Sequence, residues 1–365
     1  MPTISPSPRV RPSPYFDETV EDGVAAFTSY NHMLMPVSYG DPEAEYDRLI
    51  NGVSMWDVSV ERQVELQGPD AGRLAQRLCA RDLSNMPVNM GWYVAICDER
   101  GTLINDPILL KLAEDRYWLS IADSDVKLWA RAVAAAERMN VGVSEPDVSP
   151  LAIQGPKSDD VCAALFGDWV RDLKYFEVRE AVLDDIPLMV ARSGWSKQGG
   201  FELYLMDGAL GPALWRRVKE AGQPWGIGPG SPNQSERVES GLLSYGTDTD
   251  DETNPYEVRM GRFVDLDADF IGAEALRRIK AEGAKRKQVG LLLDDGEARP
   301  GIVKWAGARN GNRTVGHMTT NAWSPRLGRN IGIGLVARDV EVGEKLQITI
   351  GGEIVEAEVC KLPFL

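Results

Sequence analysis

The sequence predicts an α+β protein with two related ferredoxin-like modules followed by a small C-terminal β-barrel. The chain has 365 residues, which is more than one simple hydrophobic core usually organises. The segments 64–69 and 151–156 share a strand that ends in Gln-Gly-Pro, and each leads into an alanine-containing helix. From about Lys285 the sequence changes to short alternating strands between glycine and proline turns, which is typical of a barrel. The repeat therefore predicts two similar halves, and the change in pattern predicts a separate last domain.

These patterns divide the chain into four expected parts. Residues 1–50 are an N-terminal arm and the first part of the first domain, and the arm begins with a proline- and serine-rich stretch. We expect the first ferredoxin-like module over 51–145 and the second over 146–284. The barrel is expected over 285–365.

Hydrophobic periodicity predicts the elements of the first half of the chain. Proline at position 69 suits the first turn of a helix, because its missing N–H has no partner there. In chain order we expect a helix at 42–50, a strand at 62–68, a helix at 69–79, a hairpin of 92–97 and 102–111 across the turn 98–101, a strand at 116–121 and a helix at 124–140.

The same criteria predict the second half. We expect a strand within 151–156 followed by a helix, strands at 187–191 and from 201, a helix at 232–245, and barrel strands at 288–293, 315–317, 331–336, 345–350 and 354–359. The glycine-rich loop 226–230 superficially matches a dinucleotide fingerprint. Pro229 and the missing strand–turn–helix context argue against that interpretation.

Composition and charge exclude several classes of function. The net charge of −15 disfavours nonspecific binding of nucleic acid or of an anionic membrane surface. No apolar run reaches the ~18 residues that a membrane span needs, and the N-terminus lacks the apolar stretch of a signal peptide. We therefore expect a cytoplasmic protein that acts on a small molecule, with no nucleic-acid or membrane partner and with a homodimer as the candidate assembly.

Cysteine and histidine are too sparse for several familiar catalytic sites. Cys79, Cys97, Cys162 and Cys360 are scattered without a Cys-x-x-Cys pair, so we expect reduced thiols and no metal site. The chain has two histidines, and neither lies in a nucleophile motif. An enzyme with this sequence must rely on carboxylates and aromatic side chains.

The stretch 191–204 is the strongest local candidate for a binding site. It joins an apolar strand to an alternating one through a glycine-rich turn that displays Trp195 and Lys197. Glycines at 194, 199 and 200 permit positive φ and would let a ligand approach the backbone. Alternation puts Glu202 and Tyr204 on one face of the second strand. The plainer alternative is a solvated hairpin with an incidental tryptophan.

The chain resembles the folate-dependent aminomethyltransferases of the glycine-cleavage T-protein family. The resemblance extends over nearly the whole chain and implies a three-domain cloverleaf of the aminomethyltransferase type around a tetrahydrofolate channel. The segments that carry it are Gly101-Thr-Leu-Ile-Asn-Asp106, Arg192-Ser-Gly-Trp195 with Phe201-Glu202, Glu236-Arg-Val-Glu-Ser-Gly241, Asn254-Pro-Tyr-Glu257, Phe270-Ile-Gly272, Trp323-Ser-Pro-Arg-Leu-Gly328 and Lys361-Leu-Pro-Phe-Leu365.

Within this family the details are similar to the branch that demethylates dimethylsulfoniopropionate. The turn Trp195-Ser-Lys-Gln198 replaces the Tyr-Thr-Gly-Glu type of the glycine-cleavage enzymes. The resemblance implies methyl transfer to N5 of tetrahydrofolate, which gives 3-methylthiopropionate and 5-methyltetrahydrofolate. Three alternatives stay open: demethylation of glycine betaine or dimethylglycine, a glycine-cleavage aminomethyltransferase, and a non-enzymatic folate protein that assists iron–sulfur maintenance.

The resemblance also assigns the catalytic and cofactor residues. It implies that Asp106 is the catalytic aspartate near folate N5, where it accepts a proton or stabilises charge; the structural alternative is an aspartate that satisfies turn amides before Pro107. Glu202 matches the glutamate that binds the pterin, and Tyr204 and Asn105 complete the expected tetrahydrofolate set.

The expected substrate set is Tyr30, Met35, Ser120, Trp195 and Lys197. Tyr30 and Trp195 are expected to face the sulfonium through cation–π contact, which contributes about 2 kcal/mol when the cation is desolvated. Lys197 or Ser120 is expected to hold the propionate. The alternatives are ordinary core packing for Tyr30 and solvation for Lys197.

Overall fold

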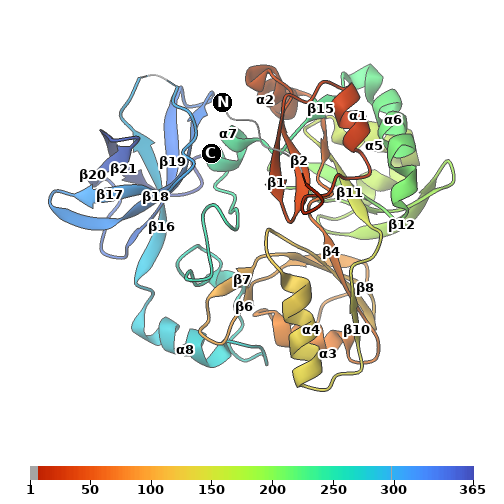
Figure 1. The fold of residues 1–365 in the computed structure, drawn as a ribbon, viewed down its shortest axis with the longest axis horizontal. Helices are drawn as coiled ribbons and strands as arrows, with labels where there is room; N and C mark the ends of the chain where they lie inside the picture. Colours follow the sequence, from red (N-terminus) through yellow and green to blue (C-terminus); the bar gives the residue numbers. More distant parts are fainter. Residues whose placement is uncertain (1–6, 297) are drawn as a thin grey trace. The chain divides into compact units, whose positions relative to one another are not determined.

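The structure is a computed structural model that describes residues 7–296 and 298–365 (Figure 1). Residues 1–6 of the expected N-terminal arm lie outside the described part. The chain forms two compact units. The first contains residues 1–75, 85–93 and 107–233, and the second contains residues 76–84, 94–106 and 234–365.

The first unit contains a sheet with the strand order β10-β4-β9-β8-β5, in which all neighbours are antiparallel. The path β4–α3–β8–β9–α4–β10 gives this sheet the order of a ferredoxin-like module, with β5 added at the edge. Its elements are β4 (Gln63–Gln67), α3 (Ala71–Leu78), β5 (Met90–Tyr93), β8 (Ile108–Ala113), β9 (Arg116–Ser120), α4 (Val126–Ala136) and β10 (Gly142–Ser144).

A second sheet in the same unit has the order β12-β13-β14-β11-β3-β15. The path β11–α5–β13–β14–α6–β15 repeats the ferredoxin-like order, while β3 inserts between β11 and β15 and pairs with β15 in parallel. The predicted repeat is confirmed, because β4 and β11 are the strands that end at the two Gln-Gly-Pro segments. Its elements are β3 (Ser54–Asp57), β11 (Ser149–Gln154), α5 (Ser158–Phe166), β12 (Val178–Leu183), β13 (Ile186–Ala191), β14 (Gly200–Leu205), α6 (Gly211–Gly222) and β15 (Gly228–Gly230).

The two sheets contact each other through one face of each. Leu110 and Trp118 of the first sheet pack with Met189 and Tyr204 of the second. The Trp118 and Tyr204 rings lie 6.2 Å apart between centroids. The same faces carry Glu65 and Glu202, both buried. Polar groups therefore lie in the interior between two sheets, where each needs a hydrogen-bond partner.

The N-terminal segment of the first unit contains more regular structure than the sequence predicts. The helix α2 (Pro42–Asn51) is confirmed, but α1 (Phe16–Glu21) and the hairpin of β1 (Ala26–Tyr30) and β2 (Met33–Ser38) are not anticipated. Asn31 and His32 form the hairpin turn with φ of 47° and 60°. Asparagine tolerates this left-handed conformation better than most residues, which explains a tight turn without glycine.

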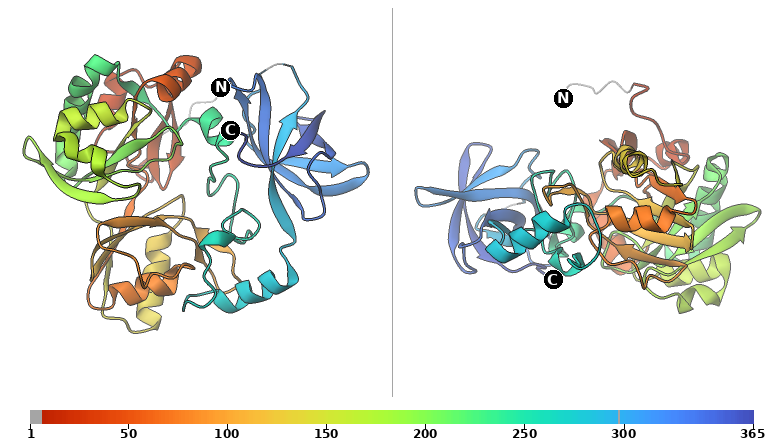
Figure 2. Two further views of the ribbon diagram at one scale, coloured as in Figure 1. Left: turned by 180° about the vertical axis from the view of Figure 1, so that it is seen from behind. Right: turned by 90° about the horizontal axis from the view of Figure 1, so that it is seen from below.

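The second unit contains the predicted C-terminal barrel. Its strands close in the order β16-β19-β18-β17-β20-β21, and β16 pairs with β21 to complete the ring. Figure 2 shows the barrel strands from behind and from below. The strand β17 is not predicted. The elements are β16 (Arg286–Leu293), β17 (Ala306–Asn310), β18 (Arg313–Ser324), β19 (Arg329–Ala337), β20 (Lys345–Ile350) and β21 (Glu353–Cys360), and α8 (Ala273–Glu282) precedes them.

One expectation in this region is wrong. The helix predicted at 232–245 is only α7 (Gln234–Glu239). It ends because Gly241 adopts φ of 60°, and the N–H groups of Gly241 and Leu242 return to the carbonyls of Val238 and Arg237. Arg237 is buried and donates to Asp248 at 2.6 Å, so it serves the fold.

The predicted hairpin of 92–97 and 102–111 is divided between two sheets. Its outer part is β5 with β8, and its inner part is β6 (Ile96–Cys97) with β7 (Leu103–Asn105). Pro107 interrupts the second strand, because proline cannot donate to a ladder. In the part of the chain that the structure describes, none of the helices has the length and apolar character needed to cross a bilayer.

Candidate functional site

Glu202 is the centre of a buried polar cluster in the first unit. It lies on β14 and is 5% exposed. Ser193 Oγ donates to Glu202 Oε2 at 2.6 Å, and the Tyr204 hydroxyl donates to the same oxygen at 2.9 Å. None of the described residues donates to Oε1. Glu202 is therefore oriented through one oxygen, and its other oxygen has no donor among the described residues.

A second carboxylate, Glu61, lies close to Glu202. It lies two residues before β4, and Ser120 Oγ lies 3.5 Å from Glu61 Oε2. Burial and then the charge of Glu202 raise the pKa of Glu61 well above its ordinary value. Burial also raises the pKa of Glu202, against the lowering effect of its bonds from Ser193 and Tyr204. Such a pair retains a proton more strongly than separate carboxyls do, so a ligand that offers N–H donors or positive charge would stabilise its ionised form.

Ser120 and Gln63 extend this cluster along the first sheet. They are directly paired residues of β9 and β4, and the Gln63 amide donates to Ser120 Oγ at 2.9 Å. Tyr204 is 1% exposed, and burial followed by the charges of Glu202 and Glu61 raises the pKa of Tyr204 well above its ordinary value. It therefore remains a hydrogen-bond donor to Glu202 at neutral pH.

The β1–β2 hairpin brings Tyr30 to the same end of the sheet. Asn31 Nδ2 donates to the carbonyls of Val60 and Ala122 at 2.9 and 3.0 Å. These carbonyls belong to the segments that carry Glu61 and Ser120. Tyr30 directly precedes Asn31 in the chain and ends β1. Tyr30 pairs with Met33, and Met35 lies two residues farther along β2, so both expected substrate residues share one face of the hairpin.

The loop that carries Trp195 and Lys197 is held by Gln154, the last residue of β11. Gln154 Nε2 donates to the Ser193 carbonyl at 3.1 Å, and Ser196 Oγ donates to Gln154 Oε1 at 2.7 Å. Gly194 has φ of 149°, and a Cβ there would lie 1.9 Å from Gln154 Nε2. The expectation that this glycine makes room for a ligand is therefore wrong, because the Gln154 side chain fills that space. Trp195 is half-buried and Lys197 is exposed.

Asp106 and Asn105 belong to the second unit. Asn105 ends β7 and is fully buried, and Asp106 follows it with 9% exposure. Tyr245 donates to the Leu103 carbonyl at 3.2 Å. Burial, followed by the charges of Asp251 and Asp106, raises the pKa of Tyr245 to about 12. Asp106 is thus a carboxylate in a largely buried setting near a protonated tyrosine.

Among the expected site residues, the structure brings Ser120, Glu202 and Tyr204 together in the first unit. Tyr30 lies on the hairpin whose turn residue Asn31 is bonded to the neighbouring segments. Glu61, Gln63 and Ser193 join the cluster around Glu202 without having been assigned a role from the sequence. The available signal was the strand pattern at 62–68, where polar and apolar residues alternate. That pattern is typical of a solvated face, whereas Gln63 and Glu65 are buried.

Two family models cover most of the chain. Residues 16–268 match the GCVT N-terminal domain, and residues 286–365 match the glycine cleavage T-protein C-terminal barrel domain. The chain belongs to the glycine cleavage T-protein family. This confirms the resemblance noted in the sequence, while the finer domain boundaries at 50, 145 and 284 stay a prediction.

Relatives within the glycine cleavage T-protein family align over almost the full chain. The dimethylsulfoniopropionate demethylase DmdA of Ruegeria pomeroyi is 43% identical over 338 residues, covering 93% of this chain and 92% of the relative. An aminomethyltransferase of Thermotoga maritima is 30% identical and covers 96% of this chain and 97% of its own. The crystal structure of the aminomethyltransferase T of Bartonella henselae superposes with a TM-score of 0.86 at 22% identity, covering 97% and 98% of the two chains. The predicted aminomethyltransferase-type fold is therefore confirmed.

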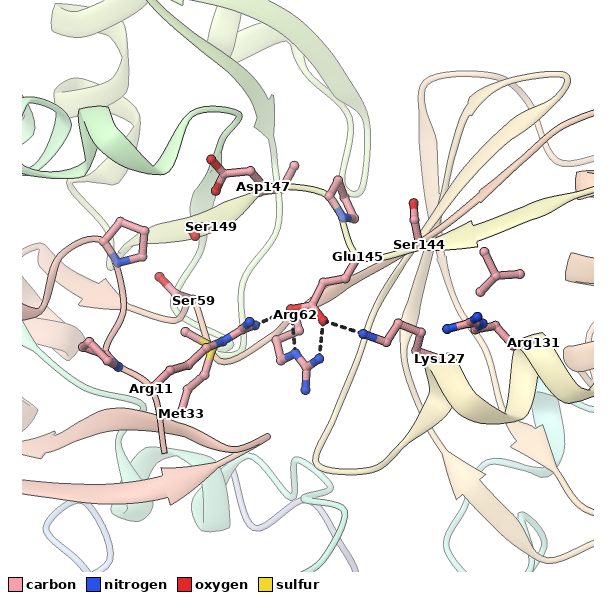
Figure 3. A pocket seen from close by; sticks show the side chains of 15 residues that line it. Arg11, Met33, Ser59, Arg62, Lys127, Arg131, Ser144, Glu145, Asp147 and Ser149 are labelled. Atoms are coloured by element: carbon pink, nitrogen blue, oxygen red, sulfur yellow. Dashed lines mark hydrogen bonds and ion pairs between the residues drawn. The ribbon is translucent and has the colours of Figure 1, made fainter. Parts of the chain in front are cut away.

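This T-protein family member also has an open cavity of about 730 Å³ in its first unit (Figure 3). Glu145 lies in it and accepts from Arg62 Nε at 2.9 Å and from Lys127 Nζ at 3.1 Å. Arg11 also pairs with Glu145. These cations lower the pKa of Glu145 to about 2, although burial acts in the opposite direction. Glu145 thus joins the N-terminal segment, the residue before β4, and α4 into one ion-pair network.

Replacing Glu145 by glutamine is expected to reduce the free energy of unfolding by about 1–2 kcal/mol at pH 7. Three cations would lose their carboxylate partner, but Arg11 is half-exposed and its share is screened. Because the folded-state pKa of Glu145 lies below its ordinary 4.5, this stabilisation is complete above that value and is lost as the pH falls towards about 2. Urea unfolding at pH 7 and pH 3 checks both parts.

The matched control for that prediction is Glu356→Gln, which breaks the exposed Lys345–Glu356 pair on the barrel. Exposed pairs of this kind contribute less than about 1 kcal/mol. The network would be contradicted if both variants lost the same free energy of unfolding. It would also be contradicted if the difference between Glu145→Gln and the wild type did not become smaller at pH 3.

Proposed function

We propose that this T-protein family member transfers a methyl group from dimethylsulfoniopropionate to N5 of tetrahydrofolate, giving 3-methylthiopropionate and 5-methyltetrahydrofolate. The observation that carries the proposal is the buried Glu202, which is fixed through Oε2 and has no donor to Oε1 among the described residues. The 43% identity to a dimethylsulfoniopropionate demethylase over 93% of the chain supports the choice of methyl donor.

The cluster around Glu202 suits a reduced pterin. Buried acceptors need donors, and the pterin edge supplies an amino group and ring N–H groups in the geometry of a donor fork. Ser193 and Tyr204 fix the carboxylate in advance, so little side-chain freedom is lost when the ligand binds. Tetrahydrofolate, the methyl-accepting substrate, would therefore be held at the pterin end by Glu202 and Tyr204, and we assign Asn105 to the same set.

The methyl donor needs a different environment. A sulfonium methyl is already activated, because a neutral thioether leaves while the positive charge passes from sulfur to N5, which then loses its proton. The protein must then align the two reactants and exclude water. We assign Tyr30 and Trp195 to the sulfonium, with Met35 beside Tyr30, since aromatic faces stabilise a desolvated cation by about 2 kcal/mol.

The propionate end is better assigned to Lys197 than to Ser120. Ser120 lies beside Glu61 and within the cluster of Glu202, and two carboxylates would repel a third. Lys197 is exposed on the loop that carries Trp195, so its ammonium could pair with the propionate. Asp106 is assigned the catalytic role, in which it accepts the proton that N5 loses or stabilises positive charge there.

A second candidate function is aminomethyl transfer in glycine cleavage, which the 30% identity to a Thermotoga maritima aminomethyltransferase favours. Onium donors of similar shape, glycine betaine and dimethylglycine, are further variants. An aromatic site does not separate a sulfonium from an ammonium by cation–π contact alone.

One assay separates these functions. Purified protein is incubated without oxygen with tetrahydrofolate and, in separate arms, dimethylsulfoniopropionate, glycine betaine, dimethylglycine, or an aminomethylated lipoyl carrier protein. The expected result is 5-methyltetrahydrofolate and 3-methylthiopropionate, in equal amounts, in the first arm. Turnover confined to the carrier-protein arm, or to an ammonium donor, would replace the proposal with the corresponding alternative.

We also place the enzyme in the cytoplasm. The four cysteines are free thiols in the structure, which suits a reducing compartment. A homodimer is the proposed assembly, and sedimentation of the purified protein tests it.

A further inference from the structure

Gln63 carries a buried hydrogen-bond acceptor that the protein leaves unused. Its side chain is 1% exposed, and Oε1 has no partner within residues 7–296 and 298–365. A buried amide oxygen without a donor costs free energy that a folded protein rarely leaves uncompensated. Such an atom therefore marks a place where a ligand donor is expected.

The orientation of this amide follows from its neighbours. Gln63 Nε2 lies 2.6 Å from the Glu61 carbonyl oxygen and 2.9 Å from Ser120 Oγ. A carbonyl oxygen can only accept, so the nitrogen must be on that side, and a flipped amide would place two acceptors against each other. The neighbours of Gln63 therefore select one of the two amide orientations, and this fixes the position of Oε1.

The next side chain on the same face of β4 is an acceptor and offers no donor. Alternation puts Gln63 and Glu65 on one face of β4, and Glu65 Oε2 already accepts from Trp118 Nε1 at 2.8 Å. Trp118 in turn packs against Tyr204, the neighbour of Glu202. The face of β4 with Gln63 therefore meets the face of β14 with Glu202, and both present an oxygen that has no donor.

We propose that Gln63 Oε1 accepts a hydrogen bond from an N–H of the reduced pterin, which makes Gln63 a binding residue for tetrahydrofolate in addition to Glu202. This inference rests on the proposed function. The methyl donor is not the ligand of this atom, because a dimethylsulfonium has no N–H or O–H to donate. The pterin edge has several N–H donors, more than one carboxylate can pair.

The test compares Gln63→Met, Gln63→Asn and Gln63→Glu in the full-length protein. Methionine keeps the length but removes the acceptor, asparagine withdraws it by one methylene, and glutamate keeps an acceptor while losing the amide donors. The control is Gln67→Met, since Gln67 ends the same strand with an exposed side chain. The measurements are the Kd for tetrahydrofolate by anaerobic titration, the KM for dimethylsulfoniopropionate, and the melting temperature.

We expect Gln63→Met and Gln63→Asn to weaken tetrahydrofolate binding about tenfold, with the KM for the sulfonium and the Gln67→Met control unchanged. Gln63→Glu keeps an acceptor and should therefore bind tetrahydrofolate more tightly than Gln63→Met. If the Gln63 amide only stabilised the fold, the order would be reversed. Gln63→Glu would then weaken tetrahydrofolate binding more than Gln63→Met, because glutamate loses both donated bonds and adds charge beside Glu61. Three results would each overturn the inference. They are the reversed order of the variants, an unchanged Kd for tetrahydrofolate in Gln63→Met and Gln63→Asn, and an effect confined to the KM for dimethylsulfoniopropionate.

If Gln63→Met does not fold, the test is made with Gln63→Asn, which keeps a polar side chain. Failure of the wild type to bind tetrahydrofolate is a separate result. It would refute the proposed function itself, whereas wild-type binding with unaffected Gln63 variants would refute only this inference.

Discussion

Glu202→Gln is expected to weaken tetrahydrofolate binding on the order of 10²–10³-fold. Hydrogen bonds to a charged group contribute about 1.5–3 kcal/mol each, and the amide would replace one acceptor with a donor that faces a ligand donor. The melting temperature should stay equal or rise, because burial raises the pKa of Glu202 and its charge also raises that of Glu61. Removing one carboxylate of this pair relieves a cost to folding. Anaerobic titration and thermal unfolding check the two halves of the prediction.

The control for Glu202→Gln is Glu180→Gln, which alters an exposed glutamate on β12 of the same sheet. It should leave binding and turnover unchanged. If Glu202→Gln bound tetrahydrofolate like the wild type, Glu202 would have to be a structural carboxylate, and the pterin site would need another location.

The order of strands and the repeat could be predicted because they depend on local patterns. The two Gln-Gly-Pro segments mark β4 and β11, and the alternation from 201 puts Glu202 and Tyr204 on one face as expected. The environment of that face could not be predicted in the same way. Alternation cannot distinguish a polar face in water from one between two sheets, so Glu61 and Gln63 received no role.

Other failures also have long-range causes. The positive φ of Gly194 was correctly anticipated, but its reason is the side chain of Gln154, which is forty residues away in sequence. The hairpin turn at Asn31 is fixed by carbonyls of Val60 and Ala122. Neither partner can be inferred from a local window of sequence, whereas the family motifs already pointed to Asp106 and Glu202.

Asp106→Asn is expected to lower kcat by about 10²–10⁴-fold, the usual effect of losing a general base or a charge that stabilises the transition state. Asparagine keeps the shape and can still accept from turn amides, so the fold and the KM for both substrates should change little. Single-turnover formation of 5-methyltetrahydrofolate measures the chemical step. The control is Asp267→Asn, an exposed aspartate of the same unit. Unchanged single-turnover rates with a lower melting temperature would reassign Asp106 to the turn before Pro107, and the proton lost from N5 would then have to pass to solvent without a protein carboxylate.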